Sequence, residues 1–240
     1  MLSKGHLKLI QNLKSKKQRA KHGLFIAEGD KIIHEILKAN LKVKTIFSTN
    51  IKAFKNYNLF KDQLIETSPA LFNEISSLSS PSTSLGIFQM QSFQFPASNY
   101  QLFLDQIQDP GNLGTIIRIA DWYGIRQIHC KTGTVDLYNP KVLQASMGSF
   151  MRVQLNYIED TALFFENNAL PVLGTFMAGE NIHKIQKPSK ALIVIGNEGN
   201  GISSDIKEYC SQEITIPKFG EAESLNAAIA TAIVLDNLIK

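Results

Sequence analysis

The sequence predicts an α/β protein in which a mostly parallel sheet is covered by helices on both faces. Runs such as 170–177 (LPVLGTFM) and 191–196 (ALIVIG) are continuously apolar, as is typical of strands buried on both sides. Helix-like segments separate several of these runs, and parallel pairing needs such connections. With 240 residues and 44% hydrophobic side chains, the chain can form one large domain or two smaller ones.

A short polar joint containing a proline, 91–99 (QSFQFPASN), is expected to separate two domains, 1–95 and 96–240. In the first domain the expected elements are a strand at 23–29, a helix at 30–40, a strand at 44–49, a helix at 68–79 and a strand at 84–90. In the second domain the expected strands are 100–107, 126–130, 151–157, 170–177, 191–196 and 212–217. One helix is expected from about Leu113, and a last helix from about Glu223 to Ile239.

The net charge of +4 is divided unevenly between these domains. Residues 1–95 carry 14 basic and 6 acidic side chains, whereas 96–240 carry 11 and 15. The first 27 residues hold seven basic side chains and no acidic one. Such a positive field attracts phosphate backbones without reading base sequence. The alternative interpretation is an ordinary solvated helix face rich in lysine.

Several classes of protein are not expected. No apolar stretch approaches the roughly 20 residues of a membrane helix, and the basic N-terminus lacks the apolar core of a secretory signal. Only Cys130 and Cys210 occur, without a Cys-x-x-Cys pair or nearby histidines, so neither a disulfide framework nor a metal site is expected. The expected location is the cytoplasm.

Ligands of doubly wound sheets bind beyond the carboxyl ends of the strands, so the loops there are the candidate ligand-binding segments. In 107–125 a turn at 109–112 precedes a helix whose apolar face holds Leu113, Ile116, Ile117, Ala120 and Gly124. The opposite face carries Thr115, Arg118 and Trp122. An arginine beside a tryptophan favours a binding interface. A surface pair between Arg118 and Asp121 is the alternative.

A second loop, 196–201 (GNEGNG), follows a buried strand. Its glycines permit a tight turn and a close backbone approach, but the pattern is neither a dinucleotide fingerprint nor a P-loop. Glu198 would repel a phosphate, so a neutral or cationic ligand is expected. The alternative is an ordinary turn in which Ser203 or Ser204 caps the next helix.

The third loop, 216–226, places Glu221, Glu223, Ser224 and Asn226 just before an apolar, alanine-rich helix. Helix capping and the helix dipole account for the serine and the two acids. They do not account for Asn226, which is expected inside the first turn, where asparagine has no capping advantage.

These three loops, in this order, resemble the SpoU (TrmH-type) branch of the SPOUT RNA methyltransferases. The motifs are Asn-x-Gly-Thr-Ile-x-Arg at 112–118, Ile-Gly-x-Glu-x-x-Gly-Ile at 195–202 and Ile-Pro-x-x-Gly-x-x-x-Ser-Leu-Asn at 216–226. The chain departs from the family at Ala227 and Ala228, where Val-Ser is frequent. The segment 16–37 is also similar to the start of the small α/β RNA-binding domain that many members carry.

The resemblance implies transfer of a methyl group from S-adenosylmethionine to a ribose 2′-hydroxyl in structured RNA, without a metal. Ribosomal RNA is favoured, because members with this N-terminal domain often act on it; transfer RNA is the alternative substrate, and a non-catalytic RNA-binding protein is the alternative function. The resemblance also implies a C-terminal trefoil knot and a homodimer. The apolar helix at 225–235 and the position of Trp122 independently favour a dimer.

By carry-over from the motifs, catalytic roles are expected for Arg118, Asn112, Glu198, Ser224 and Asn226. The cofactor pocket is expected to be lined by Leu173, Gly174, Thr175, Ile195, Gly196, Asn197, Glu198, Gly199, Ile216, Pro217, Ser224 and Leu225. Family members are thought to use the arginine, with an RNA phosphate, as the base. A guanidinium stays protonated in proteins, so the alternative role for Arg118 is to bind that phosphate and stabilise the developing alkoxide.

Overall fold

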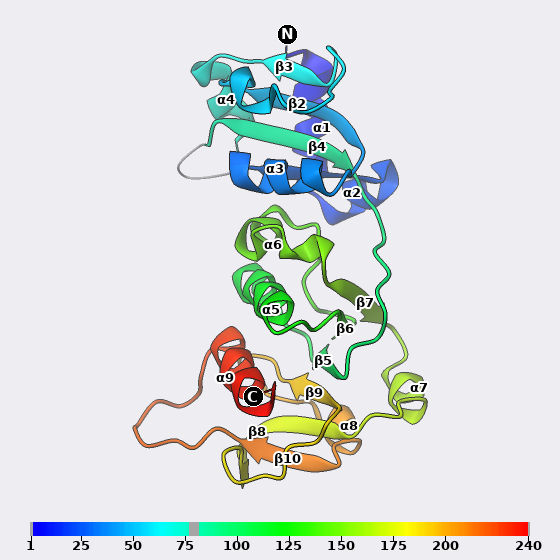
Figure 1. Cartoon of the computed structure of the whole chain (residues 1–240), viewed down its shortest axis with the longest axis vertical. Helices are drawn as coiled ribbons and strands as arrows, with labels where there is room; N and C mark the ends of the chain where they lie inside the picture. Colours follow the sequence, from blue (N-terminus) through cyan, green and yellow to red (C-terminus); the bar gives the residue numbers. More distant parts are fainter. Residues whose placement is uncertain (1, 77–81, 240) are drawn as a thin grey trace.

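The structure is a computed structural model that describes residues 2–76 and 82–239. Two sheets follow one another along the long axis of the molecule (Figure 1). In the described residues, the N-terminal sheet has the strand order β1-β4-β2-β3 and the C-terminal sheet has the order β10-β8-β9-β5-β6-β7. The chain passes from the first sheet to the second through the irregular segment 90–99.

The N-terminal sheet is mixed, because β4 runs antiparallel to β1 and β2 while β2 and β3 are parallel. Its strands are β1 (Leu24–Glu28), β2 (Val43–Ser48), β3 (Leu64–Glu66) and β4 (Ser84–Gln89). The helices are α1 (Lys4–Leu13), α2 (Lys16–His22), α3 (Asp30–Lys38) and α4 (Pro69–Ile75), with a 3-10 turn at Ile51–Phe54. These positions confirm the three strands and the two helices expected here; residues 77–79 of the helix expected at 68–79 lie outside the described residues.

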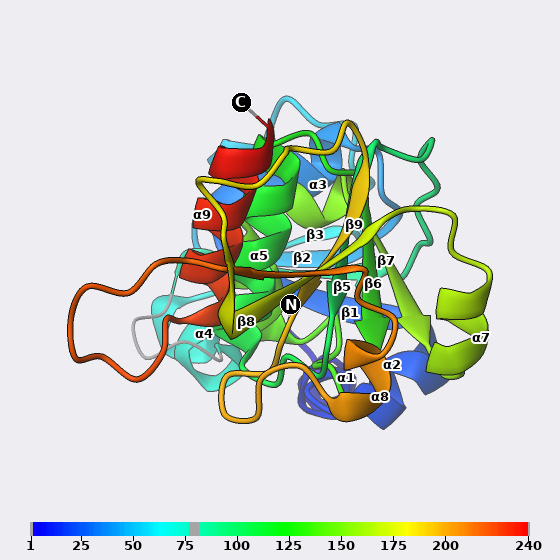
Figure 2. The ribbon, with the colours of Figure 1, turned by 90° about the horizontal axis from the view of Figure 1, so that it is seen from below.

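The C-terminal sheet is parallel throughout, which confirms the predicted fold class. Its strands are β5 (Tyr100–Leu104), β6 (Gln127–Lys131), β7 (Gln154–Ile158), β8 (Val172–Asn181), β9 (Ala191–Ile195) and β10 (Gln212–Thr215). The helices are α5 (Pro110–Trp122), α6 (Pro140–Ser146), α7 (Thr161–Glu166), α8 (Ser204–Lys207) and α9 (Ala227–Ile239). Helices α5 and α9 lie on one side of this sheet and α7 and α8 on the other (Figure 2).

Several expected boundaries are wrong. Helix α5 begins at Pro110, because the Asp109 carboxylate caps it by accepting the Asn112 N–H at 2.8 Å, and Gly124 lies beyond its end. The strand expected at 151–157 begins only at Gln154, because a 3-10 turn occupies Ser149–Met151.

The start of the last helix also differs from the prediction. Helix α9 begins at Ala227 rather than near Glu223, because the side chain of Asn226 caps it. The Asn226 Oδ1 accepts the N–H groups of Ala228 at 2.9 Å and Ile229 at 3.3 Å. The expected cap by Ser224 is therefore wrong, and so is the expectation that capping leaves Asn226 unexplained. The helix is also not covered on every side within one chain, since Ile229 is 52% exposed.

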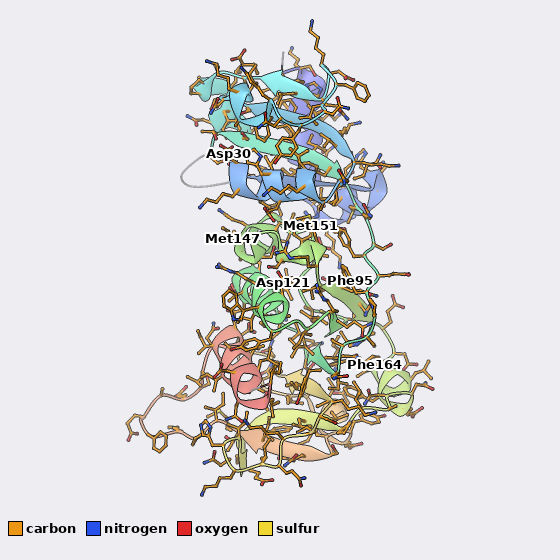
Figure 3. All side chains as sticks on the ribbon, viewed as in Figure 1. Asp30, Phe95, Asp121, Met147, Met151 and Phe164 are labelled. Carbon is orange, nitrogen blue, oxygen red and sulfur yellow. The ribbon has the colours of Figure 1, made fainter. Side chains whose placement is uncertain are left out.

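One hydrophobic core continues across the boundary between the two sheets. The Phe25 ring of β1 lies 4.8 Å from the Tyr138 ring and 6.0 Å from the Phe150 ring, both in the C-terminal part of the chain. The buried Arg19 guanidinium donates to the Asp136 carboxylate, with a shortest distance of 2.5 Å. Met151 is buried at this boundary, where it is labelled in Figure 3. The two halves are therefore joined by packed side chains as well as by the connecting segment.

A glycine of the first motif allows α5 and α6 to pack closely. A Cβ atom on Gly114 would lie 2.6 Å from both the Ala145 Cβ and the Val142 carbonyl oxygen of α6. We expect Gly114→Ala to lower the free energy of unfolding by about 1–3 kcal/mol, because α6 has to move. Gly5→Ala is the matched control, since this exposed helical position has room and should gain up to about 1 kcal/mol. Equal stability of both variants in urea unfolding would contradict this account.

Candidate functional site

The second and third loops singled out in the sequence line one cavity of about 810 Å³, and the first loop contacts its wall through the hydrogen bond from Asn112 to Glu198. The cavity lies at the carboxyl ends of β9 and β10 and beside the middle of β8, near the edge of the sheet where ligands of parallel sheets bind. Its lining comes from the segments 175–177, 195–202, 216–220 and 222–225, with Ala227 and Ala230 of α9. The last of these loops extends away from the sheet beside α9 (Figure 2).

The glycine-rich loop is held in a tight turn by its own backbone. Asn197 and Gly201 exchange two backbone hydrogen bonds of 2.9 Å, and the Asn197 Oδ1 accepts the Gly199 N–H at 2.9 Å. A Cβ atom on Gly196 would lie 2.4 Å from the Gly201 carbonyl carbon, so only glycine fits there. Gly201 has a φ of +67°, which also favours glycine. The glycines therefore shape the wall of the cavity.

Two asparagines link all three motifs through side-chain hydrogen bonds. The Asn226 Nδ2 donates to the Asn112 Oδ1 at 2.7 Å, and the Asn112 Nδ2 donates to the Glu198 Oε1 at 2.7 Å. Asn226 thus uses its oxygen to begin α9 and its nitrogen to hold α5. The chain Asn226–Asn112–Glu198 fixes the three loops relative to one another.

The structure places most of the predicted cofactor residues at the cavity. Thr175 and the predicted residues of the second and third loops line it. Leu173 and Gly174 are not among the residues that line this cavity, so their contact with the cofactor stays a prediction. Leu173 is 1% exposed in the core, and a Cβ atom on Gly174 would meet the Phe176 ring at 2.5 Å. Sequence reasoning missed the lining residues Phe176, Met177 and Asn200, which follow the predicted ones directly along the chain.

The predicted catalytic residues do not all lie together. Glu198 and Ser224 line the cavity, and Asn112 and Asn226 stand behind Glu198 in the hydrogen-bonded chain. Arg118 lies on the exposed face of α5, is not a lining residue and has no ion pair within the described part of the chain.

The alternative pairing of Arg118 with Asp121 is wrong. The Asp121 carboxylate, labelled in Figure 3, accepts from the Arg152 Nε at 2.9 Å and from its terminal nitrogen at 2.8 Å. The expected cap of α8 by a serine is also absent: Ser203 precedes the helix without capping it, because its hydroxyl donates to Asp105 at 2.6 Å. Arg118 is thus left free for a ligand.

The charge and polarity of the cavity suit an organic cation. Two carboxylates, Glu198 and Glu223, and one ammonium group, Lys218, are among its lining side chains, and the walls include Ile195 and Ile216. In 2–76 and 82–239, no three His, Cys, Asp or Glu side chains group closely enough to hold a metal ion. No helix in those ranges is long and apolar enough to cross a membrane.

The basic N-terminus forms an exposed surface of the first sheet's helices. Six lysines of α1, α2 and their junction are exposed: Lys4, Lys8, Lys14, Lys16, Lys17 and Lys21. Arg19 is the exception, because it is 3% exposed and donates to the carbonyl oxygens of Leu13 and Lys14 as well as to Asp136. Most of the positive charge of the first 27 residues is therefore exposed, where it can contact a negatively charged partner.

Comparison with known families agrees with this geometry. The model of the family described as SpoU rRNA Methylase matches residues 99–236, so the chain belongs to that family. A second model, described as MRM3-like substrate binding domain, matches residues 4–86. The resemblance drawn from the three motifs is thus confirmed.

Individual proteins resemble the chain over nearly its whole length. The 23S rRNA (guanosine(2553)-2′-O)-methyltransferase RlmP of Bacillus subtilis is 28% identical, with 95% of this chain and 93% of that protein covered. A solved structure from Porphyromonas gingivalis, assigned to the TrmH family of RNA methyltransferases, is 33% identical, with a TM-score of 0.87 and 99% and 98% covered. An rRNA methyltransferase of Sinorhizobium meliloti, solved with AdoMet bound, is 28% identical, with a TM-score of 0.84 and 99% and 95% covered.

Proposed function

We propose that this protein transfers a methyl group from S-adenosylmethionine to a ribose 2′-hydroxyl of ribosomal RNA. The observation that carries the proposal is the cavity lined by the second and third motifs, to which the hydrogen-bonded chain Asn226–Asn112–Glu198 ties the first motif. Relatives that match the chain end to end are named as rRNA methyltransferases, which supports ribosomal RNA over transfer RNA.

The residues present fit the cofactor. The cavity volume lies within the roughly 300–1,000 Å³ typical of small-molecule sites. Glu198 and Glu223 suit a ligand with an ammonium and a sulfonium charge, and Ile195, Ile216 and Leu225 offer apolar contact to a purine ring. The cofactor, when bound, supplies an electrophilic methyl group, so no metal is needed. The backbone of 195–199 and 216–217, with Thr175 and Ser224, would hold it.

Arg118 is the residue best suited to act on the RNA. Its guanidinium remains protonated, so it binds the phosphate beside the target ribose and stabilises the developing alkoxide. The hydroxyl proton is released to solvent water, and S-adenosylhomocysteine is the product that leaves when the methyl group is transferred. Asn112 and Asn226 orient Glu198 and the loops that surround the reacting groups.

The function is tested with labelled S-adenosylmethionine and total RNA from cells that lack this protein. We expect label in ribosomal RNA and a single new 2′-O-methyl site on mapping, together with cofactor binding by calorimetry. RNA binding without either result would identify a non-catalytic RNA-binding protein. Label only in transfer RNA would reject the proposed substrate and keep the reaction.

A homodimer through α5 and α9 belongs to the same proposal. These helices pack side by side (Figure 1), and their outer faces expose Trp122 at 85% and Ile229 at 52%. An interface there would cover these side chains and order the neighbouring Arg118. We expect Trp122→Glu to give monomers in light scattering, whereas Leu163→Glu on α7, where the leucine is 56% exposed, should leave the dimer intact. A monomeric wild-type protein would reject the dimer.

The proposal also covers the roles of the two domains, a knot in the C-terminal domain and the location of the protein in the cell. Residues 1–95 form the RNA-binding domain and 96–240 the catalytic domain, which the exposed lysines and the family match over 4–86 support. The C-terminal part of the chain is proposed to form a trefoil knot, which the resemblance to the SpoU family supports and which tracing the chain in a crystal structure tests. The proposed location is the cytoplasm, which the similarity to RlmP of Bacillus subtilis supports, and cell fractionation tests this.

A further inference from the structure

A buried carboxylate lies behind the glycine-rich loop, at the carboxyl end of β5. Asp105 is 1% exposed, and its Oδ2 accepts from Ser203 twice: from the backbone N–H at 2.7 Å and from the hydroxyl at 2.6 Å. The Lys131 ammonium group donates to the Ser203 hydroxyl at 2.9 Å and lies 3.6 Å from the Asp105 Oδ1. Asp205 joins the cluster through Lys131 at 2.8 Å.

Burial of the charged groups in this cluster lowers the free energy of unfolding relative to apolar side chains in the same places. Removing a carboxylate and an ammonium group from water costs more than an apolar pair of similar volume would. The Asp105 Oδ1 also has no hydrogen-bond partner within the described part of the chain. An apolar side chain at the end of β5 would give a simpler core, so the contacts of Asp105 call for a specific explanation.

The contacts of Asp105 and its neighbour hold both ends of the glycine-rich loop. Ser203 lies two residues after the end of that loop, and the Asp105 N–H donates to the Ile195 carbonyl at 2.9 Å, just before its start. The Asn197 side chain donates to the Gln106 carbonyl at 2.8 Å, near the start of the loop. The end of β5 therefore sets the positions of the loop entrance and exit at once.

We infer that Asp105, Ser203 and Lys131 form a clamp that holds the glycine-rich loop in the shape that binds the cofactor. None of the three lines the cavity, so they are positioning residues rather than contact residues. The inference rests on the proposed function, because it takes the ligand of this loop to be S-adenosylmethionine. Its consequence is specific: loss of the clamp weakens cofactor binding more than it slows the saturated reaction.

Ser203→Ala tests the clamp with the smallest change, since it removes the hydroxyl and keeps the backbone N–H bond to Asp105. We expect the dissociation constant and the KM for S-adenosylmethionine to rise about 10-fold or more, since small displacements of a site cost up to about 100-fold. At saturating cofactor, kcat should change less than about 3-fold. Amide hydrogen exchange at 197–203 should speed up even without cofactor, because the loop is released.

Matched variants separate the clamp from a general loss of stability. Ser204→Ala is the control, because this neighbouring serine is exposed and its side chain has no hydrogen bond in the described residues. Ser203→Thr keeps the hydroxyl and should restore wild-type affinity, whereas Asp105→Asn should weaken binding more than Ser203→Ala does. Wild-type affinity and loop exchange in both Ser203→Ala and Asp105→Asn would overturn the inference. A wild-type protein that does not bind S-adenosylmethionine would instead reject the proposed function.

Discussion

Replacing Arg118 with alanine is expected to lower turnover at least about 100-fold while the stability of the fold stays the same. The first expectation follows from the charge that develops on the ribose oxygen, since removal of one preorganised donor to such an oxyanion typically costs 100- to 1,000-fold. The second follows from the surroundings of Arg118, which is exposed and has no ion pair in the described residues. Single-turnover methylation and thermal unfolding measure the two quantities.

Two further variants sharpen the Arg118 experiment. Arg118→Lys keeps the charge but loses the two-pronged contact with phosphate, so we expect it to recover only part of the activity. Lys141→Ala removes an exposed cation from the neighbouring helix α6 and should leave turnover unchanged. If Arg118→Ala retains activity, or if Lys141→Ala loses as much, the role of Arg118 in the reaction is wrong.

Substitutions of Asn226 are expected to separate its two duties. Asn226→Ser keeps an oxygen that can cap α9 but removes the amide that donates to Asn112. We expect this variant to unfold at nearly the wild-type denaturant concentration and to lose about 10-fold or more of its activity, because the chain to Glu198 is broken. Asn226→Ala loses both contacts, so its free energy of unfolding should also fall by about 1 kcal/mol.

The comparison of Asn226→Ser with Asn226→Ala shows whether the asparagine serves the reaction or only the start of α9. Activity is measured per folded molecule, at saturating S-adenosylmethionine and RNA, so that a smaller folded fraction is not mistaken for slower chemistry. If Asn226→Ser is as active as the wild type while Asn226→Ala is unstable, the asparagine serves only the start of the helix. The link from Asn226 to Asn112 would then have no part in the reaction.

The sequence was sufficient for the strands of the parallel sheet and for placing the second and third loops beside each other. Continuous apolar runs such as 191–196 identify buried strands, and parallel strands bring their carboxyl ends to one edge. The three-residue strand β3 and the basic helices α1 and α2 were not predicted. Strand β3 is too short to show a periodic pattern, and the segments of α1 and α2 were interpreted by their charge rather than by their helical spacing.

The errors at the site have a common cause in tertiary contacts. Asp121 lies three residues from Arg118 on one helix, yet it pairs with Arg152, which the fold brings closer. Asn226 caps α9 through local contacts, but its second contact, to Asn112, reaches 114 positions along the chain and could not be predicted from spacing. Local spacing identifies candidates of this kind, but it cannot show which distant group reaches them first.

The hydrophobic core that the two sheets share holds the two halves of the molecule at a fixed distance from each other. The rings of Phe25, Tyr138 and Phe150 pack across the boundary, and the ion pair between Arg19 and Asp136 also crosses it. An RNA held on the lysines of α1 and α2 therefore meets the cavity at a fixed separation, which no bending of the connecting segment can change. Under the proposed function, the target nucleotide is selected by its distance from the anchoring RNA element, so that changing the spacing in the RNA should move or abolish the methylated position.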